Sequence, residues 1–540
     1  MSEKRHILRA AGIVGSMTML SRILGFSRDA MIAAYFDTRF AGDAFFAAFR
    51  IPNMLRKLFG EGALTASFIP IYTDVRAKDG EDRARELFNV AFTWLTGILS
   101  ILVALGVLFS PFVVRVLTPG FSGLDEKFDL TVRLLRWMFP YALTICWVAL
   151  FMGVLNARRI FFAPAFAPVL LNLSMIVTLV ALYHVMETPV MALAAGVLVG
   201  GILQVGMQLP YLFREGYRPT LLFRWNDKDL RRIALLMLPA LIGLSAHTLN
   251  IFVSTILASV LEAGSVGYLY YAQRMMELPL GVFAIAVGTA LLPSLSTQAA
   301  ARDHDGLIQS MGYAVRLVTL IMVPTSIGLY VLAEPIINVV FQRGEFDPLA
   351  TAQTASALRF YALGIVFFGA LRVLVPTFYA LKDTLTPALV ASGAVAVNIL
   401  TGLLLMGPPV YRNVAWINFI AGLSGDVGTL GHDGLALANS ISAVFNFSLL
   451  GWLLRRRIGR WVTGEVARTV IGSLIAGTVM AIGVGWVADK FDFTTQGLDL
   501  SKLLGLLASI LTGVVLYGAV IGLWERRRLV ELLRLMRRRK

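Results

Sequence analysis

The residues whose types could do chemistry are charged side chains in apolar, helix-length segments near the start of the chain. Arg22 and Asp29, seven residues apart, share one helix face, and Arg28 lies about 100° round the helix from Asp29. A charged side chain at bilayer depth costs about 2.5–3.5 kcal/mol on insertion scales. We therefore expect these residues to face a water-filled cavity and not lipid.

The next apolar segment continues this pattern of charges. Asp43, Arg50 and Lys57 recur every seven residues and so share a face. Arg56 falls on the adjacent face, and Glu61 lies one turn beyond Lys57. We expect this segment to line the same cavity as the first.

A third segment carries Arg274 and Glu277, three residues apart. Arginine stays charged at any relevant pH, and its planar fork matches phosphate or carboxylate through two hydrogen bonds. An excess of arginine therefore favours an anionic substrate. Acidic neighbours can pair with the arginines until a pyrophosphate or polycarboxylate displaces them. The alternative is that these charges form salt bridges between helices and only hold the protein together.

Motifs for other kinds of chemistry are missing from the sequence. It contains no Walker A loop, no glycine-rich nucleotide fingerprint and no HExxH. We therefore expect no cofactor and no metal, and any transport would draw on the membrane potential or on a gradient of Na⁺ or H⁺. Asp383, beside Lys382 and before Pro387, is a candidate ion ligand, and a loop ion pair is the alternative.

The elements that must position these residues are transmembrane helices. The chain has 540 residues, of which 57% are hydrophobic and 15% charged, and its mean hydropathy is +0.74. This composition is typical of an all-α, polytopic membrane protein. Runs of roughly 20 apolar residues can span the bilayer. They predict fourteen helices: 8–36, 41–71, 87–117, 131–155, 161–184, 190–213, 231–260, 268–297, 308–332, 352–378, 385–407, 433–455, 465–488 and 502–524.

Basic residues divide unequally between alternate loops. If the N-terminus is cytoplasmic, the cytoplasmic connections hold clusters such as the arginines at 455–457, and the basic tail 524–540 lies on the anionic inner leaflet. The opposite loops hold only Lys127, Arg343, Arg412, Lys490 and Lys502. This bias predicts cytoplasmic termini and an even number of spans. It also accounts for most of the net charge of +15, so nucleic acid is not an expected partner.

The chain matches itself at an offset of 223 residues. Residues 135–137 match 358–360, and residues 156–159 match 379–382. Such a repeat predicts two six-helix lobes in the same orientation, related by an axis along the membrane normal. The predicted parts are an N-terminal lobe over 1–223, a C-terminal lobe over 224–460 and two additional helices with a basic amphipathic tail over 461–540.

Three segments resemble the MurJ (MviN) family of lipid II flippases, within the superfamily of multidrug, oligosaccharidyl-lipid and polysaccharide exporters. They are SMTMLSRILGFSRDAMIA (16–33), DAFFAAFRIPNMLRKLFGEGALTASFIPIY (43–72) and YYAQRMMELPLGVFAIAVGTALLPSLS (270–296). The resemblance runs along essentially the whole chain. One departure is the long segment 408–432, to which we assign no role.

The resemblance implies a two-lobe, V-shaped transporter of the bacterial inner membrane that carries lipid II across by alternating access. It implies that Arg22, Arg28 and Arg274 meet the pyrophosphate of this substrate. It further implies that the last two helices form a groove for the polyprenyl tail, and that the protein is a monomer near peptidoglycan polymerases. The other implied cavity positions, with gating or substrate-contact roles, are Asp29, Asp43, Arg56, Glu61 and Glu277.

Four other interpretations remain open from the sequence. A flippase for another polyprenyl-diphosphate-linked oligosaccharide would need the same cavity. An ion-coupled multidrug antiporter would need an acidic, arginine-poor cavity. A membrane-embedded glycosyltransferase or phosphatase would need clustered carboxylates or histidines near the phosphate, and here they are dispersed. A non-transporting scaffold would tolerate the loss of the cavity charges.

Overall fold

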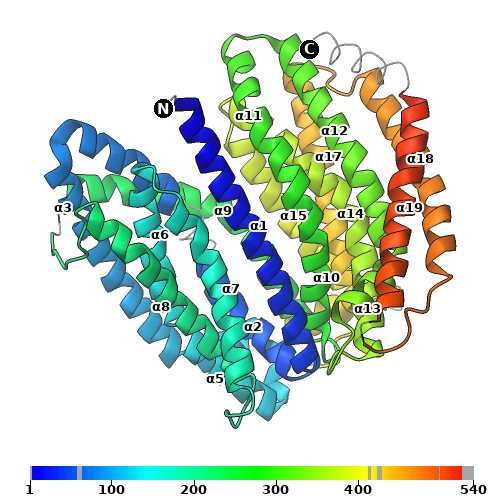
Figure 1. Ribbon diagram of the computed structural model, residues 1–540, viewed down its shortest axis with the longest axis horizontal. Coiled ribbons are helices and arrows are strands. Elements are labelled where there is room, and N and C mark those ends of the chain that lie inside the picture. Colours follow the sequence, from blue (N-terminus) through cyan, green and yellow to red (C-terminus); the bar gives the residue numbers. More distant parts are fainter. Residues whose placement is uncertain are drawn as a thin grey trace. The chain divides into compact units, whose positions relative to one another are not determined.

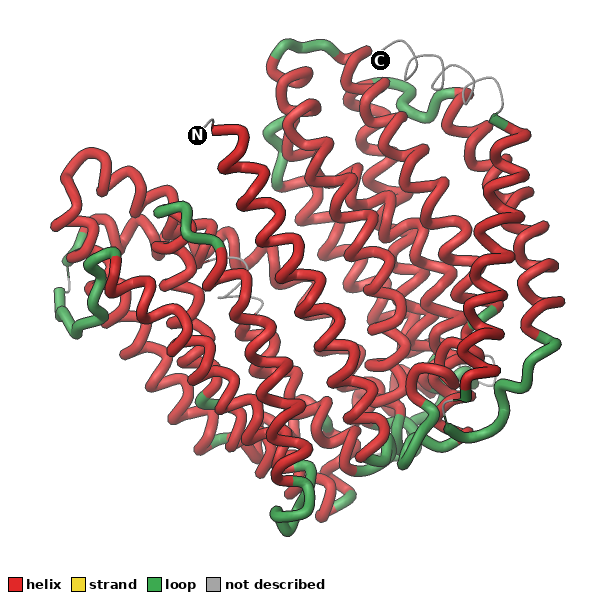
Figure 2. The backbone as a smooth tube through the Cα atoms, in the orientation of Figure 1, coloured by secondary structure: helices red, strands yellow, loops and turns green. Residues whose placement is uncertain are grey.

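The computed structural model describes residues 3–56, 64–224, 226–411, 415–422, 429–497 and 499–525. Over these ranges the chain is helical and contains no strand (Figure 2). Ten helices among the described residues are long and apolar enough to cross a membrane. The prediction of an all-α, polytopic membrane protein is therefore confirmed.

The chain divides into two compact units, Met1–Ala263 and Gly264–Lys540. The described residues of unit 1 form helices and a 3₁₀ turn, η2 (Pro119–Gly123). The helices of unit 1 are α1 (Glu3–Tyr35), α2 (Ala41–Leu55), α3 (Leu64–Leu108), α4 (Ser110–Leu117), α5 (Asp125–Met138), α6 (Tyr141–Ala157), α7 (Phe162–Leu182), α8 (Met191–Arg214) and α9 (Lys228–Ser259).

Unit 2 contains the rest of the helices and one π-helical turn, η3 (Leu280–Ala284), which directly follows Pro279. A proline removes one backbone donor, and a local change of helix type is a common response. The helices of unit 2 are α10 (Ser265–Pro279), α11 (Ile285–Ala300), α12 (His304–Val331), α13 (Ala333–Phe341), α14 (Pro348–Ala380), α15 (Leu385–Leu405), α16 (Ala415–Gly422), α17 (His432–Ile458), α18 (Gly464–Ala488) and α19 (Leu500–Trp524).

Helix α7 is central to the packing of unit 1, because it contacts both α1 and α8 (Figure 1). Glycines allow the close approach of α8. A Cβ atom added at Gly196 would lie 2.8 Å from the Cα atom of Met175, and one added at Gly200 would lie 2.5 Å from the hydroxyl of Ser174. Small residues at helix interfaces are the usual means of close packing inside membranes. This packing fixes the position of α7 beside the charged half of α1.

One end of unit 1 is tied together by ion pairs between segments far apart in the sequence. Gly80, with φ of +88°, interrupts α3. Just beyond it, Arg83 donates to Asp227 at 2.7 Å and to Asp229 at 2.9 Å. Asp227 also caps α9 by accepting from the backbone N–H groups of Asp229 and Leu230. Partial burial disfavours the ionised carboxyl, but the hydrogen bonds from Leu230, Arg83 and Asp229 outweigh it and hold the pKa of Asp227 below its usual value.

The α18–α19 pair is bound firmly into unit 2. Helix α18 packs against α12 and α19. At one end Arg316 donates to Glu465 and to Thr469, both at 3.0 Å. At the other end the buried amide of Gln342 donates to the backbone carbonyls of Thr494 and Thr495, both at 3.2 Å. Hydrogen bonds thus attach this pair to the other helices of unit 2 at both ends.

Each of the fourteen predicted spans is occupied by helix within the described residues. The exact count of fourteen stays a prediction, because ten of these helices meet the criteria for a membrane span. The division at 263/264 differs from the predicted boundary at 223/224, since α9 packs against α3 in unit 1. The segment 408–432 contains the short helix α16, while its residues 412–414 and 423–428 lie outside the described residues.

Candidate functional site

Arg28 and Asp29 are buried together inside unit 1. Arg28 donates from Nε and Nη2 to Oδ1 of Asp29, at 3.0 and 2.6 Å. It donates from Nη1 to Oδ1 of Asn172 in α7, at 2.9 Å. Arg28 is 5% exposed and Asp29 is 0% exposed. Three of the donor atoms of the guanidinium therefore meet protein acceptors, and the charge is neutralised where it lies.

The amide of Asn172 links this pair to the preceding turns of α1. Its Nδ2 donates to the backbone carbonyl of Ser21 at 3.0 Å and to the hydroxyl of Ser21 at 3.3 Å. A buried amide in an apolar helix is costly unless it is hydrogen-bonded. Asn172 meets this requirement at both ends of its amide and orients Arg28 at the same time. Arg22, the next residue after Ser21, is half-buried and forms no ion pair in the part of α1 that the structure describes.

Asp43 is also buried, in an ion pair with Lys127 of α5. The Nζ of Lys127 lies 2.6 Å from Oδ2 of Asp43 and donates to the backbone carbonyl of Arg39 at 2.8 Å. It also lies 4.1 Å from the centre of the Phe121 ring. Lys127 was expected in a loop as a marker of topology. It lies instead in the first turn of α5 and is 2% exposed.

The remaining charges of the second predicted span lie near the end of α2. Arg50 donates to the backbone carbonyl of Ile251 in α9 at 3.2 Å. Arg56 directly follows α2 and donates to Oδ1 of Asn53 at 3.1 Å. Lys57 and Glu61 lie outside the described residues. Of the charged residues predicted in this segment, the structure therefore describes Asp43, Arg50 and Arg56.

Arg274 and Glu277 form a separate group in unit 2. The two side chains of α10 are 3.7 Å apart and 35% and 39% exposed, so both remain open to solvent or ligand. Gln273 donates to the other carboxylate oxygen of Glu277 at 3.4 Å. Arg372, in α14, is exposed and interacts electrostatically with Glu277. The Glu277 carboxylate thus pairs with Arg274 and interacts electrostatically with a second arginine from another helix.

Asp383 stands in the connection between α14 and α15, where both its oxygens have protein partners. It accepts from the backbone N–H of Thr386 at 3.0 Å and from the Thr386 hydroxyl at 2.7 Å, and it pairs with Arg457. Desolvation alone would raise the pKa of Asp383, but these hydrogen bonds hold it below its usual value. The structure thus places Asp383 in a loop ion pair, and its role as an ion ligand stays a prediction. Over the described ranges, no three His, Cys, Asp or Glu residues gather as a metal site would require.

Most of the chain, from the last turn of α1 onward, matches a known family. The family model described as "Lipid II flippase MurJ" matches residues 32–504, which is well over half of the chain. The chain belongs to the MurJ family.

Curated members of the MurJ family match nearly the full length of the chain. The "Probable lipid II flippase MurJ" of Vibrio cholerae serotype O1 is 34% identical over 528 residues, covering 95% of this chain and 97% of that protein. The "Lipid II flippase MurJ" of Burkholderia cenocepacia is 33% identical over 519 residues, covering 95% and 96%. These relatives are transporters and not enzymes, and with the spans described above they make this chain a multi-pass protein of a bacterial inner membrane.

Solved structures agree with the fold of the MurJ family. A structure titled "Lipid II flippase MurJ, inward closed conformation" superposes with a TM-score of 0.77 at 24% identity and covers 96% of this chain and 99% of that one. An inward-facing MATE family multidrug transporter of the MOP superfamily superposes with a TM-score of 0.63 at 17% identity, covering 84% and 98%. The chain therefore shares its fold with both of these structures.

Measured against the sequence-based site, the structure adds three residues. Asn172 and Arg372 lie within apolar runs of predicted spans, and an amide or a charge at such depth is a signal that could have singled them out. Lys127 gave no such signal, because a lysine beside a predicted span usually marks a loop. The expectation that Arg28, Asp29 and Asp43 are open to water is not met, since ion pairs and a buried amide cover them.

Proposed function

We propose that this chain is a lipid II flippase, which moves the lipid-linked peptidoglycan precursor from the cytoplasmic to the periplasmic leaflet. Membership of the MurJ family and relatives named for this activity support the proposal. We further propose that it works by alternating access. The fold shared with an inward-closed MurJ and an inward-facing MATE transporter supports this part.

The observation that carries the mechanism is the buried pairing of Arg28 with Asp29 and Asn172. A pyrophosphate offers more charge and more acceptor oxygens than one carboxylate, so it can take over the donors of the guanidinium. In the absence of substrate, Asp29 keeps the arginine neutralised and in place. When oxygens of the pyrophosphate replace Asp29 and Asn172 as partners of Arg28, the protein responds to the bound headgroup.

We propose that the predicted cationic cluster of Arg22, Arg28 and Arg274 binds the pyrophosphate during part of the cycle. In α1, Asp29 pairs with Arg28, and in α10, Glu277 pairs with Arg274. Glu277 then neutralises Arg274 in the absence of substrate, as Asp29 neutralises Arg28. Asp43, Arg56 and Glu61 are proposed to contact the substrate or to gate its passage. Their removal should change transport without creating a new substrate preference.

Several further features belong to the same proposal. Both termini are proposed to be cytoplasmic, with the cycle driven by the membrane potential or by a Na⁺ or H⁺ gradient. The α18–α19 pair is proposed to hold the polyprenyl tail, which its attachment to unit 2 at both ends supports. The protein is proposed to act as a monomer that hands its product to peptidoglycan polymerases.

The test is the sidedness of lipid II in cells depleted of this protein, read with an impermeant probe of the outer leaflet. We expect outward-facing lipid II to fall while the total pool rises, and wild-type protein to restore the balance. The matched variants are Arg28→Gln/Asp29→Asn, which removes the pair without leaving a buried charge, and Arg359→Gln, which removes a partly exposed pair with Glu334. Only the first should fail to restore the balance.

Two outcomes would contradict the proposal in different ways. Unchanged sidedness of lipid II with accumulation of another polyprenyl-linked glycan would keep the mechanism and replace the cargo. Unchanged levels and sidedness of every lipid-linked sugar would remove the transport function itself. In that case the charges would have the scaffold role that the sequence left open.

A further inference from the structure

Two short connections of unit 2 lie at the same boundary of the membrane. Residues 381–384 connect α14 to α15, and residues 459–463 connect α17 to α18, and all four helices are long and apolar enough to cross a membrane. The ion pair of Asp383 with Arg457 joins the first connection to the end of α17. A short connection between two successive spans lies outside the hydrocarbon layer. The last turn of α17 is therefore at the level of the lipid headgroups.

Three arginines at this end of α17 have no acidic partner. Arg455 and Arg456 lie in the last turn of the helix, and Arg460 lies in the connection that follows. All three are exposed, and in the part of unit 2 that the structure describes none of them forms an ion pair. Their N–H donors are therefore available to an anion from outside the protein.

The acidic residues on this side of unit 2 do not balance these arginines. Asp383 is held by the ion pair described above, and Glu465, at the start of α18, pairs with Arg316 of α12 at 3.0 Å. This pair places Arg316 level with the start of α18. Asp303 and Asp305 precede Arg316 by 11 residues or more, so they lie at least roughly 16 Å farther out along α12.

The remaining charges at this boundary are also mostly positive. Glu525, just after α19, accepts from Thr469 of α18 at 3.3 Å, and the adjacent Arg468 is an exposed cation on the same helix. Lys382, in the connection between α14 and α15, is exposed and forms no ion pair in the described part of unit 2. The net exposed charge around the end of α17 is therefore positive.

A tryptophan orients one of the three arginines at the edge of the hydrocarbon layer. The Arg456 guanidinium lies 3.8 Å from the ring centre of Trp452, one turn earlier in α17. Trp452 is 47% exposed, and Ser448, one further turn into the bilayer, is exposed too. Tryptophan is typical of the headgroup level, and a ring beneath a guanidinium leaves its N–H donors free for an anion. This face of α17 therefore combines an open aromatic surface with donors at headgroup level.

The chain after α17 folds back and keeps Arg460 at the same end of the helix. Gly459 has φ of +90°, a conformation that favours glycine, and it begins the turn. Trp461 is 5% exposed and donates from Nε1 to the backbone carbonyl of Gly451 at 2.9 Å. A Cβ atom added at Gly451 would lie 3.0 Å from the Trp461 ring, so this ring lies directly on α17. Arg460, between Gly459 and Trp461, is thus held close to the last turn of α17.

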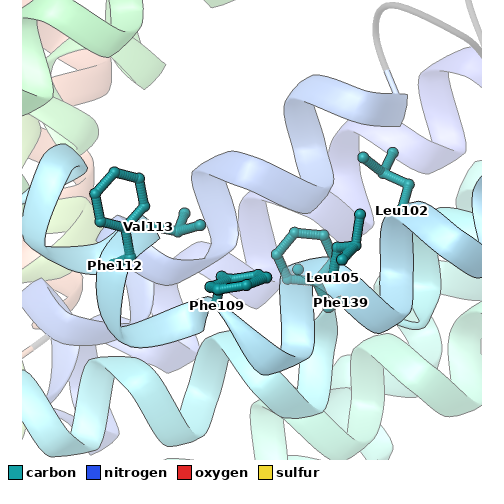
Figure 3. A pocket seen from close by; sticks show the side chains of 7 residues that line it. Leu102, Leu105, Phe109, Phe112, Val113 and Phe139 are labelled. Carbon is teal, nitrogen blue, oxygen red and sulfur yellow. The ribbon is translucent and has the colours of Figure 1, made fainter.

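An apolar pocket in unit 1 provides a contrast (Figure 3). It lies at the junction of α3 and α4, and its lining residues carry hydrocarbon side chains or none: Leu102, Leu105, Gly106, Phe109, Phe112, Val113 and Phe139. Such a lining accepts a hydrocarbon chain but cannot select a lipid by its headgroup. The end of α17 offers both an apolar surface and unpaired cations.

We infer that the end of α17 binds an anionic glycerophospholipid of the adjacent leaflet. Its phosphate lies at Arg456 and Arg460, and one acyl chain lies along Trp452. The planar fork of arginine matches phosphate oxygens, and clustered basic residues at a membrane surface attract anionic lipids. A zwitterionic lipid adds a cationic group that the arginines repel, so it binds more weakly. The inference does not depend on the proposed transport function, because it uses none of the proposed substrate residues.

Native mass spectrometry of the full-length, delipidated protein tests this site. The probes are dioleoyl phosphatidylglycerol and dioleoyl phosphatidylcholine, added separately in detergent. We expect the wild-type protein to bind phosphatidylglycerol at least tenfold more tightly than phosphatidylcholine. The variant Arg456→Gln/Arg460→Gln should lose about 30-fold in affinity for phosphatidylglycerol and bind both lipids alike.

A control variant separates this site from the general excess of basic residues. Arg214→Gln/Arg218→Gln removes the same amount of charge from two exposed arginines at and after the end of α8, which form no ion pair within residues 64–224. It should bind phosphatidylglycerol as the wild type does. An equal loss of affinity in this control would overturn the inference, because the arginines of α17 would then act only through the net charge.

A third variant tests the contribution of the aromatic ring. Trp452→Leu keeps an apolar side chain but removes the ring beneath Arg456, so it should bind phosphatidylglycerol about threefold more weakly. Its melting temperature should stay unchanged, since Trp452 is exposed. Equal binding of the two lipids by the wild-type protein would overturn the inference. Displacement of bound phosphatidylglycerol by equimolar inorganic phosphate would also overturn it, because the site would then bind free phosphate and not a lipid.

Discussion

Asp43 and Lys127 form a buried ion pair of 2.6 Å that joins α2 to α5, with both side chains 2% exposed. Such a pair is strongly destabilising when only one partner is removed, because the other charge stays buried. Its position between two helices makes it a structural contact of unit 1, whatever further role Asp43 has in transport. The two roles can be separated by experiment.

Lys127→Met should lower the stability of the protein by about 3–5 kcal/mol, since it removes the cation that pairs with the buried charge of Asp43. The double variant Asp43→Leu/Lys127→Met should recover most of that loss, because it replaces the pair by apolar groups. Thermal unfolding in detergent, followed by loss of monodisperse protein, measures both effects. If the double variant is as unstable as the single one, the pair is not the main contribution of these residues to the fold.

Asp227→Asn tests the charge that links Arg83 to the start of α9. Asparagine still caps the helix, so the variant removes only the ionic part of the contact, at a cost of about 1–2 kcal/mol. The folded-state pKa of Asp227 is below the unfolded value of about 3.9. Its ionised form therefore stabilises the fold above that pH, and this contribution is lost as the pH falls through the folded-state pKa.

We therefore expect the melting temperature of Asp227→Asn to be lower than that of the wild type at pH 6–8, and the difference to disappear as the pH falls through the folded-state pKa of Asp227. Melting curves in detergent at stepped pH measure this difference. Asp79→Asn, at an exposed position one residue before Gly80, is the control and should show no gap. A gap for Asp227→Asn that widens in acid would contradict the assigned direction of the pKa shift.

Gln342→Ala should loosen the connection between α18 and α19. Gln342 is 2% exposed, donates to two carbonyls of that connection and accepts from Nδ2 of Asn338 at 2.7 Å. Its loss leaves buried polar groups unsatisfied, at about 1–3 kcal/mol, so backbone amides at 494–497 should exchange roughly tenfold faster. Hydrogen exchange with mass spectrometry reads this directly. Gln496→Ala, which removes an exposed bond to Gly344, should have a smaller effect, and equal effects would disprove the anchor role of Gln342.

Arg372→Gln should reduce transport at least tenfold if Arg372 shares Glu277 with Arg274, because the carboxylate then pairs with Arg274 alone and competes with the substrate. The variant should still insert and melt like the wild type, since Arg372 is exposed. The rate at which outward-facing lipid II appears in complemented cells measures transport. An unchanged rate would contradict this prediction and show that Arg372 has no part in transport.

The helices could be predicted from the sequence because a membrane span requires a long apolar run, and α7, α15 and α19 each coincide with such a run. The positions of charges along α1 could be predicted for the same reason, since any charge in such a run is exceptional. Periodicity gives the face of a helix but not its neighbour. The pairing of Arg28 with Asn172, 144 residues later, therefore could not be predicted.

Partners from distant helices also explain the difference at Asp43. Its spacing from Arg50 predicts a shared helix face, and a shared face of charged residues predicts a shared cavity. The structure instead buries Asp43 against Lys127 of α5, because a carboxylate at that depth needs a cation and α5 brings one. Which cation approaches a given carboxylate depends on the packing of whole helices, and the sequence pattern alone does not contain it.

The measurement that tests the central claim most directly is the flipping of lipid II by purified protein in liposomes. Fluorescent lipid II in the outer leaflet is quenched by an impermeant reductant, and the protected fraction reports movement across the bilayer. We predict that wild-type protein makes nearly all of the fluorescent lipid II accessible to the reductant. In liposomes that contain Arg28→Gln/Asp29→Asn, folded and incorporated to the same level, the protected fraction should equal that of protein-free liposomes. Equal flipping by the wild type and the double variant would contradict the account, because the buried pair would then have no part in moving the substrate.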